Sequence, residues 1–305
     1  MILHQLELYY SEMVTNMDKN ELDNNKLPAL SKRLQTVADM VEPGSKVADV
    51  GTDHGFVPIY LAKAGLASHA IAMDVRKGPL ERATQHVKEY KLEDVIETRL
   101  SDGLEKLFEG EADTMICAGM GGPLMQKILE NKDPRSVKLK TLILEPQSEL
   151  MQFRIFLREK GYEIVQEEFL LEDGKYYPVI KTVVNYELSP EKTETISKSE
   201  TDIASEEFTN LPKAYLNAID KLKQILDSKK ENYTDSQLLR ICDRFGPCIL
   251  TSPNADFKSF LVHEKAVCDT ILGKISDVKD SHIKRAEQIS LERSDINIAL
   301  HLFDL

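Results

Sequence analysis

Short apolar runs alternate with amphipathic stretches along residues 46–187. The runs KVADVG, HAIAMD, IETRLS, ADTMICAG and TLILEP predict buried strands. The stretches FVPIYLAKAG, PLERATQHVKEY, GPLMQKILEN and ELMQFRIFLREKG follow four of these strands and have the apolar spacing of helices. Strands that alternate with helices predict an α/β protein with a parallel, doubly wound sheet.

Two longer β-patterned runs, YEIVQEEFLLED and KYYPVIKTVVNYE, close this region. They are joined by Asp173 and Gly174, and aspartate-glycine between such runs is a strong hairpin signal. The hairpin adds antiparallel strands, so we expect a mixed sheet of about seven strands.

The flanking segments predict two further parts. The stretch LSKRLQTVADMV has the pattern of an amphipathic helix, with Ser31 as its cap. From residue 188 the chain is polar and aperiodic, and after about residue 200 it predicts long helices in a hairpin or coiled-coil appendage. We therefore divide the chain into an N-terminal extension (1–29), a core domain (30–187), and a polar insertion followed by a helical domain (188–305). An apolar stripe, with Glu264 as its one polar break, marks one of the helices; its apolar members are Phe257, Phe260, Leu261, Val267, Cys268, Ile271 and Ile275.

The composition argues against several classes of protein. No run approaches the roughly 18 apolar residues of a membrane span, and the N-terminus lacks the features of a secretory signal. The four cysteines form no CxxC pair, which argues against zinc and against a disulfide framework and favours a reduced, cytoplasmic protein. The net charge of −12 disfavours general polyanion binding, although one basic face can still hold a folded RNA.

Acidic and glycine residues recur where the predicted strands end. The first strand ends at Asp49 and Gly51, and the second ends at Asp74, roughly 20 residues past the first turn. The third is followed by Asp102 and Gly103, and the fourth runs into the glycine-rich CAGMGG. Ligands of open α/β sheets bind over these strand ends, and the joint pattern is typical of a class I S-adenosylmethionine methyltransferase.

A dinucleotide is the competing cofactor. Its GxGxxG turn holds a pyrophosphate at a helix N-terminus. Here the first turn carries Asp53, whose carboxylate would repel a pyrophosphate but tolerates a sulfonium or an amine. A hydride-transfer enzyme is therefore the weakest alternative.

Several blocks of the sequence resemble one methyltransferase family. SKRLQTVAD, VADVGTDHGFVP, AMDVRKGP, SDGLE, ICAGMGG and LLEDGKYYPV occur in family order from Ser31 to about Val179. They are similar to the signature blocks of the bacterial tRNA (adenine(22)-N1)-methyltransferases, the TrmK family. FGPCIL, near Gly246, resembles the block that opens the family's C-terminal helical arm. Residues 1–29 and about 188–240 fall outside the resemblance, and LEPQ stands where the family pattern has glutamine-proline-asparagine.

The resemblance implies a class I methyltransferase fold, Rossmann-like, with a helical appendage and S-adenosyl-L-methionine as cofactor. The positions that match the family's motifs imply these cofactor-binding residues: Asp49, Gly51, Asp74, Val75, Asp102, Gly103, Ala118 and Gly119. Asp49 and Gly51 would line the methionine end, Asp74 would hold the ribose, and Asp102 would hold the adenine. Asp53 is implied as the catalytic acid with His54 beside it, and no role follows for Glu145 or Gln147.

An adenine N1 acceptor agrees with this site. The ring nitrogen has a free lone pair, so a carboxylate that accepts a hydrogen bond from the exocyclic amine would raise its nucleophilicity. The fourth strand lacks the Asn/Asp-Pro-Pro-aromatic motif of exocyclic-amine methylases. A paired adenine must be flipped out, and the glycine-rich turn Gly119–Gly122 would leave room for the base. The residues expected to hold tRNA phosphates are Lys32, Arg33, Arg76 and Lys77, with Arg82 and Arg135 as further candidates.

Two other functions stay open from the sequence. One is a small-molecule methyltransferase, and the other is a non-catalytic protein that binds S-adenosylmethionine or RNA. We expect tRNA as partner, no metal and no membrane, and the sequence leaves the choice between a monomer and a weak dimer open.

Overall fold

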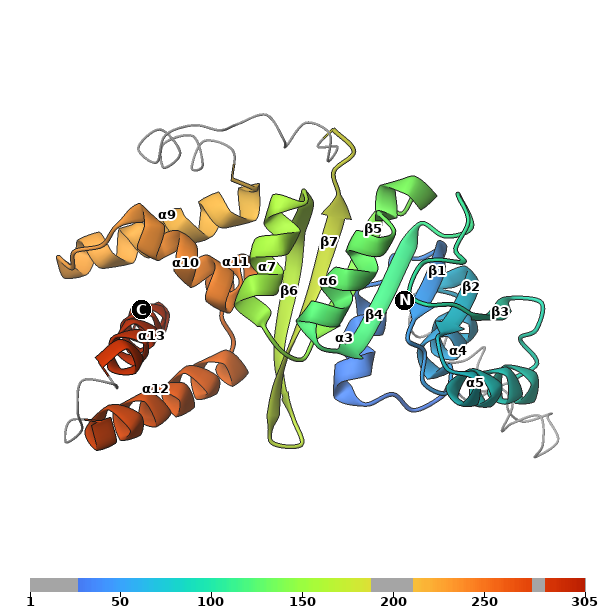
Figure 1. Cartoon of the computed structure of the whole chain (residues 1–305), viewed down its shortest axis with the longest axis horizontal. Helices are drawn as coiled ribbons and strands as arrows, with labels where there is room; N and C mark the ends of the chain where they lie inside the picture. The colour runs from blue at the N-terminus through green and yellow to red at the C-terminus, as the bar shows by residue number, and fades with distance from the viewer. Residues whose placement is uncertain (1–26, 188–210, 276–282, 305) are drawn as a thin grey trace, which may run out of the picture. The chain divides into compact units, whose positions relative to one another are not determined.

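The computed structural model describes residues 27–187, 211–275 and 283–304 (Figure 1). Most of the predicted N-terminal extension and of the polar insertion lies outside the described residues. The predicted boundaries at residues 30 and 187 stay predictions.

Seven strands of the described chain form one mixed sheet with the order β3-β2-β1-β4-β5-β7-β6. Strand β1 pairs in parallel with β2 and β4, β2 pairs in parallel with β3, and β7 runs antiparallel to both β5 and β6. The predicted mixed seven-stranded sheet is therefore confirmed. The strands are β1 (Ser45–Val50), β2 (Ala67–Asp74), β3 (Ile96–Leu100), β4 (Thr114–Met120), β5 (Thr141–Pro146), β6 (Tyr162–Glu172) and β7 (Lys175–Val184).

Contacts divide the chain into two compact units, and β4 contributes residues to both. The first unit runs to Ile116 and includes Ser136–Leu139. The second unit comprises Cys117–Arg135 and Lys140–Leu305.

In the first unit, three helices accompany β1, β2 and β3: α3 (Lys32–Asp39), α4 (Phe56–Lys63) and α5 (Lys77–Glu89). Helices α4 and α5 pack on these strands, and α3 packs on α4. Ser31 caps α3, since its hydroxyl accepts the N–H of Leu34 at 3.4 Å. Val37 and Val41 are buried on the predicted apolar face, so this amphipathic helix and its cap are confirmed.

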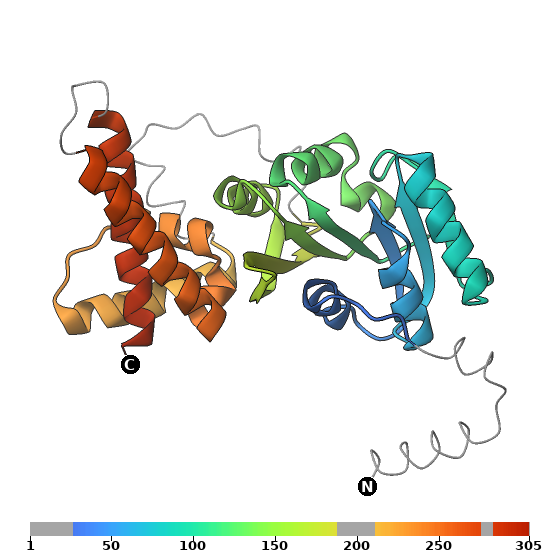
Figure 2. The ribbon, with the colours of Figure 1, turned by 90° about the horizontal axis from the view of Figure 1, so that it is seen from below.

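In the second unit, α6 (Gly122–Asn131) and α7 (Leu150–Glu159) lie over one face of the β5, β7 and β6 strands (Figures 1 and 2). Asp173 and Gly174 join β6 to β7 with φ angles of 48° and 75°. Such left-handed backbone at both central residues is what a tight hairpin turn requires, and it confirms the hairpin prediction.

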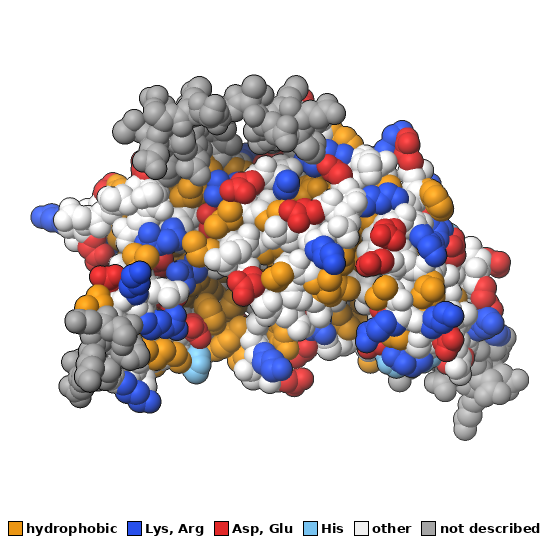
Figure 3. Space-filling view, viewed as in Figure 1, with side chains coloured by type: hydrophobic (Ala, Val, Ile, Leu, Met, Phe, Trp, Pro, Cys, Tyr) orange, Lys and Arg blue, Asp and Glu red, His pale blue; other side chains and the backbone are white. Residues whose placement is uncertain are grey.

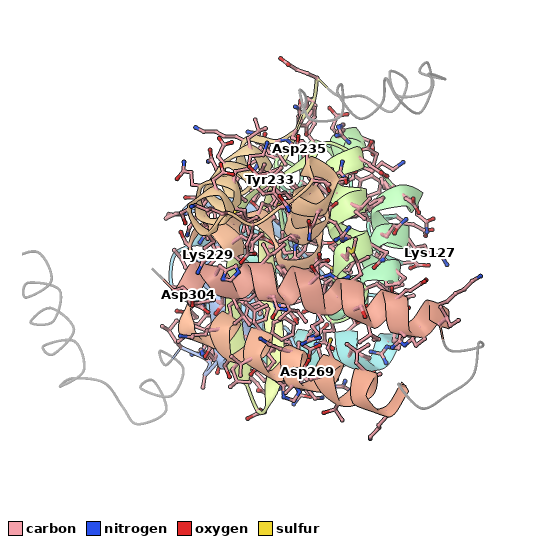
Figure 4. All side chains as sticks on the ribbon, turned by 90° about the vertical axis from the view of Figure 1, so that its left-hand side faces the viewer. Lys127, Lys229, Tyr233, Asp235, Asp269 and Asp304 are labelled. Carbon is pink, nitrogen blue, oxygen red and sulfur yellow. The ribbon has the colours of Figure 1, made fainter. Side chains whose placement is uncertain are left out.

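Five α-helices complete the described part of the second unit: α9 (Lys213–Lys229), α10 (Asp235–Phe245), α11 (Pro247–Thr251), α12 (Ala255–Ile275) and α13 (Ile283–Leu300). Helices α12 and α13 pack along each other, as the predicted helical hairpin requires. An ion pair between Lys229, at the end of α9, and Asp304, with Nζ and Oδ2 3.1 Å apart, joins α9 to the C-terminal residues (Figure 4). The apolar stripe of α12 is only partly buried, because Phe257, Leu261 and Cys268 are covered while Val267 stays 38% exposed. The separate helices α10 and α11 were not predicted.

A buried ion pair joins these helices to the sheet. The Arg154 guanidinium on α7 donates to the Glu167 carboxylate on β6 at 2.8 Å, and neither side chain is more than 1% exposed. Arg154 also donates to the backbone carbonyls of Asp243 and Arg244, and Glu167 accepts the N–H of Cys248 at 3.0 Å. The pair thus satisfies the backbone groups where α10 ends and α11 begins.

Candidate active site

The turn after β1 is anchored on the end of β2. The N–H groups of Gly51 and Thr52 both donate to the Met73 carbonyl, at 2.8 and 2.9 Å. His54 and Gly55 then take left-handed φ angles of 63° and 71° before α4 begins. Glycine is required at the second position, because a Cβ on Gly55 would lie 3.2 Å from the Cβ of Ala83 on α5. This tight turn brings Asp53 and His54 out at the carboxyl end of β1.

Two buried carboxylates stand at the ends of β1 and β2. Asp49 is 7% exposed and Asp74 is 6% exposed. Burial raises the pKa of Asp49 to about 6, the nearby Thr52 hydroxyl opposes the rise, and the charge of Asp74 adds to it. One Asp74 oxygen accepts the Arg76 N–H at 2.6 Å, which holds the carboxylate in the turn before α5.

The third acidic residue lies beyond β3. Asp102 is exposed, and Gly103 behind it is buried with a φ of 52°. Ser101 orders this turn, because its N–H donates to the Asp74 carbonyl and its hydroxyl donates to the Gly103 carbonyl, both at 3.0 Å. The structure therefore gathers Asp49, Asp74 and Asp102 at one edge of the β1–β3 sheet, as the sequence predicted.

Asp53 is a further exposed acid at this edge, with a side chain 68% accessible. Its Oδ1 lies 3.2 Å from Nη2 of Arg82 on α5 and 3.5 Å from Nε2 of His54. The sequence suggested Arg82 only as a phosphate ligand. Its contact with Asp53 arises from the packing of α4 against α5, which no local pattern reveals.

The His54 ring belongs to a stack of three rings. Its centroid lies 5.5 Å from those of Phe56 and His86, and Phe56 and His86 are 5.0 Å apart. Nδ1 of His86 lies 2.9 Å from the His54 carbonyl, so a protonated Nδ1 donates to it and supports the left-handed turn. His86 and Phe56 were missed as site residues, because only the fold brings α5 against the turn.

The turn after β4 belongs to the second unit. Ala118 is partly exposed and Gly119 is exposed with a φ of 80°. The Gly119 N–H donates to Oε2 of Glu145 at 2.7 Å, so this amide is already engaged within the protein. The backbone contacts that we expect between these two residues and a cofactor stay a prediction. Because the Gly119 N–H is engaged, such contacts would use the other backbone groups of the turn.

The expected phosphate ligands differ in their surroundings. Lys32 and Lys77 are exposed, Arg33 is partly exposed, and Arg76 is 75% exposed beside Asp74, with its Nε 3.7 Å from that carboxylate. Val75, expected at the cofactor, is 59% exposed. On the face in Figure 3, lysine and arginine side chains are interspersed with acidic ones rather than gathered in one patch.

Arg135 has a structural role instead. Its side chain is only 10% exposed, and its guanidinium donates to the carbonyls of Asn185 and Lys160 and to Asp133. The suggestion that Arg135 holds phosphate is therefore wrong, because its donors are used to tie the end of β7 to that of α7.

Within the described ranges, no cluster of His, Cys, Asp and Glu residues could hold a metal ion. Cys117, Cys242, Cys248 and Cys268 are all free thiols. None of the helices that the structure describes has the length and apolar character to cross a membrane.

Comparison with known proteins finds methyltransferases. The family described as "Methyltransferase domain" matches residues 30–180. The tRNA (adenine(22)-N(1))-methyltransferase of Bacillus subtilis is 40% identical over 151 residues, which cover 50% of this chain and 63% of that relative. The chain thus spans less than two thirds of this relative in the sequence match.

Solved structures match over a longer range. The crystal structure of the B. subtilis m1A22 tRNA methyltransferase TrmK has a TM-score of 0.68 at 28% identity, covering 90% of this chain and 100% of that one. An uncharacterized protein from Listeria monocytogenes serotype 4b has a TM-score of 0.70 at 26% identity, covering 89% and 100%. The mixed seven-stranded sheet with acids at its strand ends is therefore that of the class I methyltransferase fold. Within that fold, the chain is similar in sequence and in structure to the bacterial tRNA (adenine(22)-N1)-methyltransferases, the TrmK family.

Proposed function

We propose that this protein transfers a methyl group from S-adenosyl-L-methionine to N1 of adenine 22 in tRNA, in the cytoplasm. The proposal is based on the carboxylates at the edge of the sheet where strands β1, β2 and β3 end. Two buried carboxylates, Asp49 and Asp74, lie there beside an exposed one, Asp53, which Arg82 and His54 hold in place.

The residues of this edge fit the cofactor. Asp49 offers a buried carboxylate to an α-ammonium group, and Asp74 offers one to the ribose hydroxyls. Asp102 is exposed beside Gly103 and can accept from an adenine amine. The bound cofactor supplies an electrophilic methyl group on a sulfonium.

Asp53 serves the acceptor base. It accepts a hydrogen bond from the exocyclic amine of adenine, which raises electron density at N1 and stabilises the positive charge that the ring gains. Arg82 and His54 restrict the carboxylate, so it is aligned before the base arrives. The N1 lone pair forms the new bond to carbon as the carbon–sulfur bond breaks, and no proton has to leave first.

The experiment that tests the proposal uses methyl-labelled S-adenosylmethionine and unmodified bacterial tRNA, followed by digestion and nucleoside analysis. Label in 1-methyladenosine is expected, and a tRNA transcript with adenine 22 replaced by guanine should stay unlabelled. Label in another nucleoside would overturn the role of Asp53. Absence of label, with cofactor binding intact, would point to a small-molecule or non-catalytic role.

A further inference from the structure

Glu145, at the end of β5, is a buried acidic residue to which methyl transfer, as proposed, assigns no role. Its side chain is fully buried, with 0% exposure, and acidic side chains are rarely buried without a specific partner. Oε2 of Glu145 accepts the N–H of Gly119 at 2.7 Å. A carboxylate that accepts a backbone N–H makes a stronger bond than a neutral acceptor does.

Two backbone hydrogen bonds also join the turn after β4, which Glu145 contacts, to the turn after β5. The Gln147 N–H donates to the Met120 carbonyl at 2.9 Å, and the Gly122 N–H donates to the Ser148 carbonyl at 3.1 Å. The turn after β4 (residues 118–122) and the turn after β5 (residues 145–149) therefore form one packed unit.

The glycines of the first turn are explained by this packing. A Cβ on Gly121 would lie 2.8 Å from the Ser148 hydroxyl, and a Cβ on Gly122 would lie 2.6 Å from the Ser148 carbonyl oxygen. Gly122 needs glycine so that the two backbones can approach, whereas at Gly121 the Ser148 hydroxyl would have to turn aside. At Gly119 the requirement is a φ of 80°, which the hydrogen bond to Glu145 maintains.

We propose that Glu145 is a positioning residue for methyl transfer. Through its bond to the Gly119 amide it sets the conformation of residues 118–122, and so the groups that this turn presents at the carboxyl end of β4. The proposal rests on the proposed function, because methyl transfer is its main readout. The essential property is the acceptor atom at Oε2, so an amide oxygen of the same reach can replace the carboxylate.

The test compares Glu145→Gln with Glu145→Met, which has similar length but no comparable acceptor. Glu130→Gln is the control, since Glu130 is an exposed acid on α6. We expect Glu145→Met to lower kcat on the order of 10²-fold and to weaken the binding of S-adenosylmethionine as well, because Ala118 and Gly119 are expected cofactor contacts. Glu145→Gln and the control should keep kcat within about threefold. If Glu145→Met is unfolded, Glu145→Asp takes its place, because the shorter side chain withdraws the acceptor.

The amide resonance of Gly119 gives a readout that does not need activity. Its hydrogen-bonded NMR shift should persist in Glu145→Gln and be lost in Glu145→Met. A folded Glu145→Met with normal kcat, a Glu145→Gln as impaired as Glu145→Met, or an unchanged Gly119 resonance would each overturn the proposal. If the wild-type protein does not methylate tRNA, the proposed function fails instead, while the Gly119 shift still tests the bond.

Discussion

Asp49, which we propose to bind the ammonium group of the cofactor, lowers the stability of the folded chain at neutral pH. Burial raises its pKa to about 6; the nearby Thr52 hydroxyl opposes this rise, and the charge of Asp74 adds to it. A raised carboxyl pKa means that the folded chain binds this proton more tightly than the unfolded chain does. The contribution of Asp49 to stability is therefore best at low pH and falls as the pH rises from about 4 to about 6.

We expect the affinity for S-adenosylmethionine to fall about tenfold per pH unit below about pH 6, because the protonated Asp49 no longer attracts the ammonium group. Calorimetric titration between pH 5 and 8 measures this. Asp49→Asn should bind weakly at every pH and should unfold at a higher temperature than the wild type at pH 7. A wild-type affinity that is flat down to pH 5 would contradict the assignment.

Asp53→Ala is expected to lower kcat on the order of 10²-fold while cofactor affinity stays within about threefold, because we propose that this exposed acid accepts a hydrogen bond from the acceptor base. Single-turnover methylation and cofactor titration separate the two effects. Asp94→Ala, at an exposed turn before β3, is the control and should behave as wild type. Preserved turnover in Asp53→Ala would leave Asp53 as a residue of the turn only.

At the scale of elements, Gly246 is the point where α10 meets α11. Its φ is 99°, and a Cβ there would lie 2.5 Å from both carboxylate oxygens of Glu167. The buried pair of Glu167 and Arg154 cannot move aside without losing its bonds to the two helix ends.

Gly246→Ala should therefore destabilise the protein by about 3 kcal/mol or more, from backbone strain and the displaced ion pair together. Gly44→Ala isolates the strain, because Gly44 has a φ of 85° and an added Cβ would have nothing within 4 Å, and it should cost about 1 kcal/mol. Urea unfolding of both variants gives the comparison. Equal losses of stability in the two variants would show that the Glu167–Arg154 ion pair can shift to make room for the added methyl group.

At the scale of the whole molecule, a chain with net charge −12 has to bind a polyanion through a local set of cations. Of the expected ligands, Arg76 and Lys77 lie exposed at the start of α5, on the same helix as Arg82. They are the candidates closest in sequence to the Asp74 turn.

We expect the affinity for tRNA to fall steeply with salt, by roughly 10- to 10²-fold between 50 and 200 mM, if about two to four phosphates are contacted. Lys77→Gln should weaken binding and make the slope of log K against log salt shallower by about 1. Lys88→Gln, at an exposed position near the end of the same helix, is the control. Identical slopes for Lys77→Gln and the wild type would exclude a phosphate contact at Lys77.

The sequence by itself determined the strands, most of the helices, the hairpin at Asp173 and Gly174, and the acids at the strand ends. These follow from local periodicity and turn chemistry, which depend on residues close in the chain. Because parallel strands end at a common edge, the gathering of Asp49, Asp74 and Asp102 followed as well.

Only the tertiary structure decided which partners those residues have. Arg82 meets Asp53, His86 supports His54, Glu145 holds Gly119, and Arg135 turns inward to the β7 end. Each contact joins residues that lie 26 to 50 positions apart in the chain. Such contacts depend on how helices and turns pack, and packing between distant segments leaves no local pattern in the sequence.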